Sequence, residues 1–93
     1  MMLNKKDIED FCKKNDIEYL AIFGSYARGD FREDSDIDVL VKFNKRKSLL
    51  DLVRMERELS RIMNRKVDLL TENSISKYLR DIIKRELVVV YEG

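Results

Sequence analysis

The sequence predicts an α/β (α+β) fold, in which a small mixed β-sheet has helices packed mainly on one face. Apolar runs of strand length alternate with segments of helical spacing, in the order α-β-short α-β-α-β-α-β. The 93 residues are enough for one modest hydrophobic core, and no repeat or low-complexity linker interrupts them. We therefore expect one domain over residues 1–93.

A helix and a buried strand are expected first. Asn4 and Asp7 form a capping-box pattern, which predicts a helix that begins near residue 5. The side chains that this helix should turn inward are Ile8, Phe11 and Cys12. The next segment, IEYLAIF at residues 17–23, is too short for a globular helix and is stopped by Gly24. It is therefore expected to be a buried central strand.

The second strand and a long helix follow. The strand is expected at DIDVLVKF, residues 36–43, and alternation gives it two different faces. One face carries Ile37, Val39, Val41 and Phe43, and the other carries Asp36, Asp38 and Leu40. Ser48, with Asp51 at the third helical position, should cap a helix that runs to about residue 63, where Asn64 ends it in the left-handed conformation. The apolar stripe of this helix is Leu49, Leu52, Met55, Leu59, Ile62 and Met63.

The remainder is expected to form a strand, a helix and a strand. KVDLL, residues 66–70, is the third strand and carries Asp68 in its middle. A helix at about residues 75–84 and a strand at ELVVVY, residues 86–91, follow. The apolar face of this helix is Ile75, Tyr78, Leu79, Ile82 and Ile83. We predict that one core contains Ile22, Phe23, Val39, Val41, Leu59, Ile62, Leu69 and Ile83.

Composition excludes several classes of function. The 19 basic and 18 acidic side chains nearly cancel to a net charge of +1, so direct binding to nucleic acid or to an anionic membrane is not expected. The absence of histidine excludes Cys/His zinc sites and Ser-His or Cys-His catalysis, and Cys12 alone cannot form an internal disulfide. Because no apolar run approaches the length of a signal peptide or a membrane span, we expect a cytoplasmic protein.

A pair of like charges stands at the start of the second strand. Asp36 and Asp38 lie on one face about 7 Å apart, and neither has an adjacent basic residue. A divalent cation would relieve their repulsion, and Mg²⁺ prefers such oxygen ligands. Asp68, in a strand that a helical crossover can bring alongside, could supply a third carboxylate. Three acids around two metal ions is an arrangement used for phosphoryl or nucleotidyl transfer.

The corner after the first strand suits phosphate binding. Gly24 lets the backbone approach a ligand, and Ser25 presents a hydroxyl and an amide at the start of a short helix over residues 26–28. Arg28 can add positive charge toward the phosphates. If the first two strands pair antiparallel, this corner and both aspartates lie at one edge of the sheet.

Each feature also has an ordinary structural interpretation. A Gly-Ser pair is usually a turn, Asp68 alone would normally mark the exposed side of an edge strand, and the acids at residues 30, 33 and 34 are expected to form a solvated loop. A calcium loop read from Asp34 fails, because its sixth position is Val39 and its twelfth is Lys45. A phosphatase would place its D-x-D nucleophile after its strand, not before it. The joint pattern favours a metal-dependent transferase.

The joint pattern also resembles a known family. GS at residues 24–25 is followed after ten residues by DID at residues 36–38, with RG at residues 28–29 and Ser35 between them. This resembles the signature of the polymerase-beta-like nucleotidyltransferase superfamily, and the chain is similar over nearly its whole length to the small minimal nucleotidyltransferases. Those proteins are encoded beside HEPN-domain toxins. The resemblance implies the polymerase-beta-like nucleotidyltransferase fold.

The resemblance also implies roles for the site residues. Asp36, Asp38 and Asp68 would bind Mg²⁺, with two ions expected and Mn²⁺ able to replace them, and Asp68 would help to deprotonate the attacking hydroxyl. Ser25, beside Gly24, would contact the nucleotide phosphates. The implied reaction transfers AMP from ATP to a tyrosine of the HEPN toxin, which silences this RNase. Because this chain carries no extra acceptor-holding domain, a partner should position the acceptor.

Two alternatives remain open at this stage. The chain could neutralise its toxin by stoichiometric contact without catalysis, although a pure binder has no need to hold repelling carboxylates together. It could also transfer a nucleotide to a small molecule or an RNA end. The sequence leaves open the acceptor, the choice of nucleotide, and whether the protein forms a homodimer or a hetero-oligomer with the toxin.

Overall fold

A computed structural model describes residues 5–29 and 36–93, with only the backbone described at residues 25, 26 and 73. Its elements are α1 (Lys5–Lys14), β1 (Ile17–Phe23), α2 (Ser25–Arg28), β2 (Ile37–Phe43), α3 (Leu49–Met63), β3 (Val67–Thr71), a 3₁₀ turn (Glu72–Ser74), α4 (Lys77–Lys84) and β4 (Val88–Glu92). This order confirms the predicted fold class. The predicted cap at Asn4 and the acids at residues 30, 33 and 34 lie outside the described residues.

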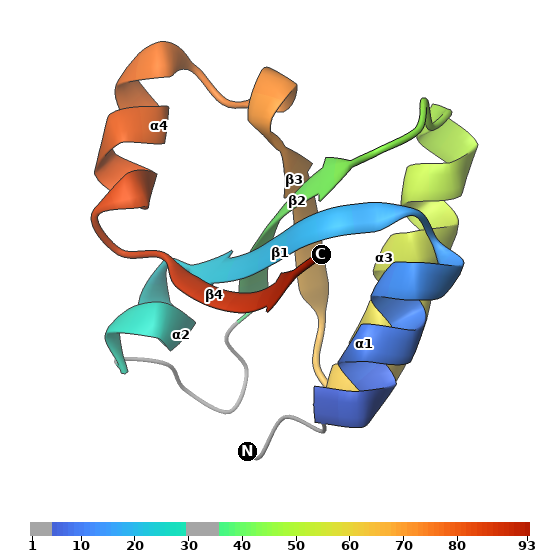
Figure 1. The fold of residues 1–93 in the computed structure, drawn as a ribbon. Helices are drawn as coiled ribbons and strands as arrows, with labels where there is room; N and C mark the ends of the chain where they lie inside the picture. Colours follow the sequence, from blue (N-terminus) through green and yellow to red (C-terminus); the bar gives the residue numbers. More distant parts are fainter. Residues whose placement is uncertain (1–4, 30–35) are drawn as a thin grey trace.

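The described strands form one mixed sheet in the order β3-β2-β1-β4 (Figure 1). β1 pairs antiparallel with both β2 and β4, as predicted for the first two strands. β2 and β3 are parallel, and the chain passes between them through α3. The sequence analysis expected such a helical crossover to bring Asp68 alongside β2, and α3 provides it.

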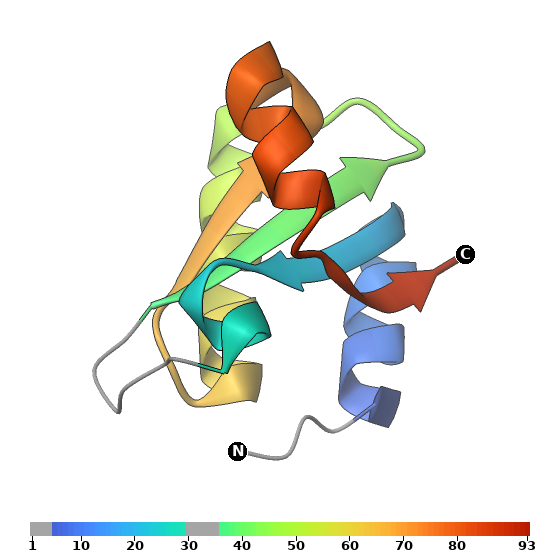
Figure 2. The ribbon, with the colours of Figure 1, turned by 90° about the vertical axis from the view of Figure 1, so that its left-hand side faces the viewer.

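The helices divide the molecule into two unequal layers. α1 and α3 cover one face of the sheet and α4 lies on the other (Figures 1 and 2), while the short α2 follows the end of β1 and packs Ala27 against the core on the α1 and α3 side. Between the sheet, α1 and α3 lies the larger core. Its buried members are Ile8, Phe11, Cys12, Ile17, Leu20, Ile22, Ile37, Val39, Val41, Met55, Leu59, Met63 and Val67.

A smaller cluster lies on the opposite face, so the prediction of a single core is wrong. Phe23, Leu40, Ile75 and Ile83 form this second cluster. Of the eight predicted core residues, Phe23 and Ile83 belong to it, while Ile62 and Leu69 pack partly buried against the larger core. The cause is strand alternation: Ile22 and Phe23 are neighbours in β1 and therefore point to opposite faces.

The apolar faces predicted for α3 and α4 are partly wrong. At the start of α3, Leu49 is 78% exposed, whereas Leu59 is fully buried. On α4, only Ile83 is buried, and Tyr78, Leu79 and Ile82 are exposed. α4 packs on the sheet mainly through Ile83. The rest of its apolar surface therefore stays exposed to solvent.

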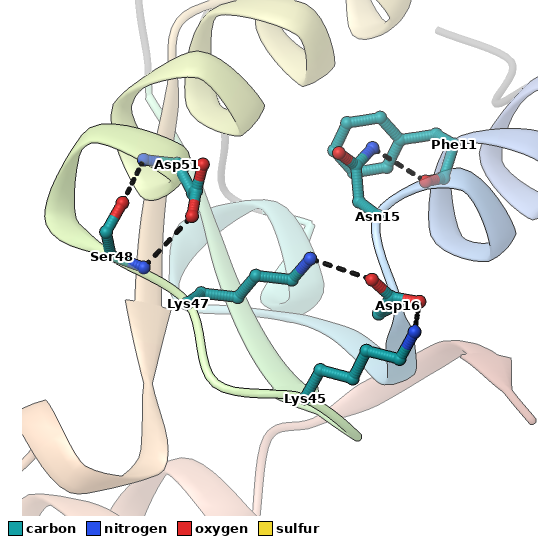
Figure 3. Close-up of polar contacts among 7 residues, drawn as sticks. All are labelled: Phe11, Asn15, Asp16, Lys45, Lys47, Ser48 and Asp51. Carbon is teal, nitrogen blue, oxygen red and sulfur yellow. Dashed lines mark hydrogen bonds and ion pairs between the residues drawn. The ribbon is translucent and has the colours of Figure 1, made fainter.

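The loop that leads into α3 is held by polar contacts (Figure 3). Ser48 and Asp51 form the predicted reciprocal capping box, with hydrogen bonds of 3.1 and 3.2 Å. Lys47 Nζ lies 2.8 Å from Asp16 Oδ2, and Lys45 Nζ lies 3.7 Å from Asp16 Oδ1. These contacts tie the loop after β2 to the turn between α1 and β1, which holds α3 against the sheet.

Two further predictions are confirmed. Asn64 ends α3 in the left-handed conformation, with φ 54° and ψ 38°. Cys12 is a core thiol, and burial, helped by the charge of Glu9, raises its pKa to about 12.

Within the described ranges, no helix has both the length and the hydropathy that a membrane span requires.

Candidate active site

The structure brings the three predicted carboxylates to one region of the sheet. Asp38 in β2 lies directly opposite Asp68 in the parallel strand β3, and Asp36 immediately precedes β2. Alternation places Asp38 and Asp68 on the face that also carries Leu40, away from α1 and α3. All three are half-buried rather than fully exposed. The prediction of a shared face is therefore confirmed for Asp38 and Asp68, while Asp36 lies just before the strand and close enough to influence the pKa of Asp38.

The environment of Asp38 disfavours its charged form. Burial raises the pKa of Asp38, and the nearby charges of Asp68 and Asp36 raise this pKa further. Arg28 opposes these effects by lowering the pKa, but it does not cancel them. The repulsion expected from the sequence is present, and a cation bound among these oxygens would remove it.

Asp36 has a basic neighbour that the sequence analysis did not expect. Lys66 Nζ lies 3.8 Å from Asp36 Oδ2. The parallel register explains this contact: Ile37 is paired with Val67, so the residues that precede them come together. Because the Lys66 side chain is 71% exposed, solvent screens this ion pair, and Lys66 can move away to admit a cation.

Gly24 lies directly against one of the carboxylates. Its φ is +77°, and a Cβ atom at this position would overlap Asp38 Oδ2 and lie 3.3 Å from Asp38 Cγ. The glycine was predicted to let a ligand approach the backbone. The structure adds a second reason, since only glycine leaves room for the Asp38 carboxylate at this corner.

The other two residues predicted to bind phosphate, Ser25 and Arg28, lie at the two ends of α2. Ser25 is the first residue of α2, so its backbone is at the predicted helix start. Arg28 is bound to Glu86 through contacts of 3.0 and 3.2 Å from its Nη1 atom. The sequence gave no signal for this pairing, because Glu86 comes from the loop between α4 and β4. Arg28 is still near enough to Asp38 to influence its pKa.

The carboxylates are not gathered around a single point. In the part of the chain that the structure describes, no group of three or more aspartate, glutamate or cysteine side chains is arranged to hold a metal ion. The donor chemistry nevertheless fits a hard divalent cation, since Asp36, Asp38 and Asp68 offer carboxylate oxygens, and the charges of Asp68 and Asp36 disfavour the ionised form of Asp38. Metal binding by Asp36, Asp38 and Asp68 therefore remains a prediction, and it requires their side chains to rotate toward one another.

Comparison with known proteins gives a consistent result. The family model for the nucleotidyltransferase domain matches residues 5–90. A proposed protein adenylyltransferase of Methanocaldococcus jannaschii, MJ0435, is 48% identical over 86 residues, which is 92% of each chain. The protein adenylyltransferase MntA of Thermococcus cleftensis is 36% identical over 74 residues, which covers 80% of this chain and 75% of MntA.

The fold is also that of a solved complex. A chain in the structure of the tri-AMPylated Shewanella oneidensis HEPN toxin with its MNT antitoxin superposes with a TM-score of 0.72. The match covers 98% of this chain and 71% of that chain, at 20% identity, and so establishes the shared fold alone. With the matched domain, the relatives and the carboxylate-bearing sheet face in agreement, the chain belongs to the nucleotidyltransferase family, among the minimal nucleotidyltransferases related to MntA.

Proposed function

We propose that this nucleotidyltransferase is an antitoxin that transfers AMP from ATP to a tyrosine hydroxyl of a HEPN-domain toxin. The observation that carries the proposal is the meeting of Asp38 and Asp68 across two strands, with Gly24 against the Asp38 carboxylate. Two further findings support it. The relative MntA is named a protein adenylyltransferase, and a solved complex with this fold contains an AMPylated HEPN toxin.

The carboxylates would hold Mg²⁺, or Mn²⁺ in its place. Asp36, Asp38 and Asp68 offer hard oxygen donors, and their mutual repulsion favours a cation between them. When bound, such an ion neutralises charge on the nucleotide phosphates. The backbone amides of the corner at Gly24 and Ser25 would donate hydrogen bonds to the nucleotide phosphates.

The reaction can be written in terms of the chain's own residues. The tyrosine oxygen attacks the α-phosphorus of ATP, the bond from that phosphorus to the bridging oxygen breaks, and pyrophosphate leaves. Asp68, on the strand next to Asp38, would accept the proton of the attacking hydroxyl. The products are an AMP-tyrosine ester and pyrophosphate.

The test compares Asp38→Asn with Asp10→Asn, which changes an exposed carboxylate on α1. Each variant is mixed with the HEPN partner, ATP and Mg²⁺, and the partner is analysed by mass spectrometry for AMP on tyrosine. Losing a metal-binding carboxylate should slow transfer roughly a thousandfold or more, while Asp10→Asn should retain the wild-type rate.

Toxin rescue in cells separates catalysis from simple binding. The double variant Asp36→Ala, Asp38→Ala should fold and leave the toxin unmodified and active. If this variant protects cells as well as the wild type does, neutralisation is stoichiometric and the catalytic proposal is wrong. If AMP is instead found on a small molecule or an RNA end and never on the toxin, the acceptor assignment is wrong.

A further inference from the structure

The two edges of the β-sheet are protected differently. β3 and β4 end the strand order, so each has one side without a neighbouring strand (Figure 1). On β3, alternate backbone amides donate to side chains outside the sheet: Val67 to Ser60 Oγ (3.0 Å), Leu69 to Glu56 Oε2 (3.3 Å) and Thr71 to Ser74 Oγ (3.1 Å). Side chains of α3 and of the 3₁₀ turn therefore occupy the amides that another strand would need.

The other edge, at β4, has no such cover. Among the described residues, no side chain donates a hydrogen bond to the backbone of β4 or accepts one from it. The segment LVVVY at residues 87–91 contains neither a charged side chain nor a proline, the residues that commonly keep an edge strand from pairing. The backbone of β4 is therefore open to a further strand.

Two exposed valines lie on this edge. Val88 is 50% exposed and Val89 is 48% exposed, although consecutive strand residues point to opposite faces of the sheet. Their neighbours in β1, Ile22 and Ala21, are both buried. The two faces of the sheet are thus covered as far as β1, and β4 is exposed on both faces because no strand follows it.

The charges at the two ends of β4 are opposite in sign. Arg85 is the C-cap of α4, just before the strand, and Glu92 is the last residue of the strand. When two β4 strands pair antiparallel, the basic end of each copy meets the acidic end of the other. A two-fold axis makes this favourable contact occur twice, so the strand is complementary to itself.

We propose that β4 is a self-association surface, on which a second copy of this chain adds its own β4 antiparallel and joins two four-stranded sheets. The register of β4 with β1 shifts beyond Val89, so the regular stretch centres on Val88 and Val89. A two-fold axis between these valines places Arg85 near Glu92 of the second copy.

A second copy fits this edge better than a strand of another protein. Another strand matches the charged ends only if its own charges are complementary, whereas the second copy always supplies the match. The dimer also leaves the carboxylates uncovered, because Asp38 and Asp68 lie on β2 and β3 and β1 separates these strands from β4. Each copy therefore keeps its own open site.

The first experiment measures molecular mass by sedimentation equilibrium over a range of protein concentrations, without ATP or a partner. We expect a monomer–dimer equilibrium. Val89→Lys places a charge on the open edge and should raise the dimer dissociation constant roughly tenfold or more. Val53→Lys is the matched control, because Val53 is 45% exposed but lies on α3, and it should leave the constant unchanged.

The second experiment reverses the charges at the ends of β4. Arg85→Glu alone and Glu92→Lys alone should each weaken the dimer, since like charges then meet. The double variant restores complementary ends and should recover most of the lost affinity. Damage to the monomer fold would accumulate in the double variant and would not be reversed, so recovery identifies a contact between copies.

Amide hydrogen exchange locates the contact within the sheet. Protection of the backbone amides at residues 88–91 should rise with protein concentration as the dimer forms. The amides of Val67 and Leu69 already donate to side chains of α3, so their protection should not depend on concentration.

Three results would overturn the inference: a monomer at every concentration, an unchanged dimer in Val89→Lys, or no recovery in the double charge variant. If the chain alone is monomeric and Val89→Lys loses binding to the HEPN partner, the edge belongs to a strand of that partner and not to a second copy. Because the mass and exchange measurements use neither ATP nor partner, their outcome is independent of AMP transfer.

Discussion

Replacing Gly24 with alanine should disable the site by displacing one carboxylate. The added methyl group would come too close to Asp38 Oδ2, so the Asp38 side chain must shift away from its place opposite Asp68. Misplacing a catalytic group by about 1 Å typically costs roughly a hundredfold in rate. We expect AMP transfer and Mg²⁺-dependent nucleotide binding to fall by at least this factor.

Gly29 provides a matched control for backbone strain. Its φ is +81°, close to that of Gly24, but a Cβ atom there would meet nothing within 4 Å. The left-handed conformation costs a residue with a side chain about 1–2 kcal/mol, partly offset by about 0.4–1 kcal/mol of lost unfolded-state entropy. Each substitution should therefore lower the free energy of unfolding by about 1 kcal/mol, equivalent to roughly 4–8 °C in Tm.

The comparison uses urea unfolding for stability and mass spectrometry of the partner for activity. Gly24→Ala and Gly29→Ala should be similar in stability and differ roughly a hundredfold in activity. Equal activity in the two variants would refute the argument that the glycine makes room for Asp38.

Three further predictions test the core, a helix cap and the charge at the site. Leu59→Ala should lower the free energy of unfolding by roughly 2–5 kcal/mol in urea titrations, because Leu59 is fully buried; a change below 1 kcal/mol would contradict this packing. Ser48→Ala should cost about 1 kcal/mol in the same assay through loss of its bond to the Asp51 amide, and no loss would show that the capping box is not stabilising. Asp38→Asn, without divalent cations, should raise Tm at pH 7, because burial and the charges of Asp68 and Asp36 raise the pKa of Asp38 and so penalise its ionised form. This gain should vanish as the pH falls through that raised pKa and the wild-type carboxylate takes up a proton; a gain that grows toward low pH would contradict the sign.

Residue patterns that span only a few positions were enough to predict much of the fold. The strand at residues 17–23 and the capping of α3 by Ser48 follow from patterns within a few residues, and the structure confirms both. The shared face of Asp38 and Asp68 followed from alternation together with one assumption, the parallel crossover. The outcome confirms that assumption.

The errors concern contacts between elements that are distant in sequence. A continuous apolar run such as β1 does not reveal which side chains face which layer, and so the prediction of a single core placed Phe23 together with Ile22. Helical spacing identified the apolar residues of α4 but not how far the sheet extends beneath Tyr78. Arg80, three positions before the buried Ile83, was a readable sign of a charged group on the inner face of α4.

The parallel pairing of β2 with β3 has a consequence for how the protein acquires activity. β1 and β2 can form a local antiparallel pair that places Asp38 beside Gly24 early in folding. Asp68 comes beside Asp38 only when the chain through α3 closes a long loop, and we expect this contact between distant residues to form more slowly. Partly folded or stalled chains therefore hold an incomplete set of carboxylates. Catalytic competence should appear with the last cooperative step of folding, and its recovery during refolding should lag behind the formation of helical structure.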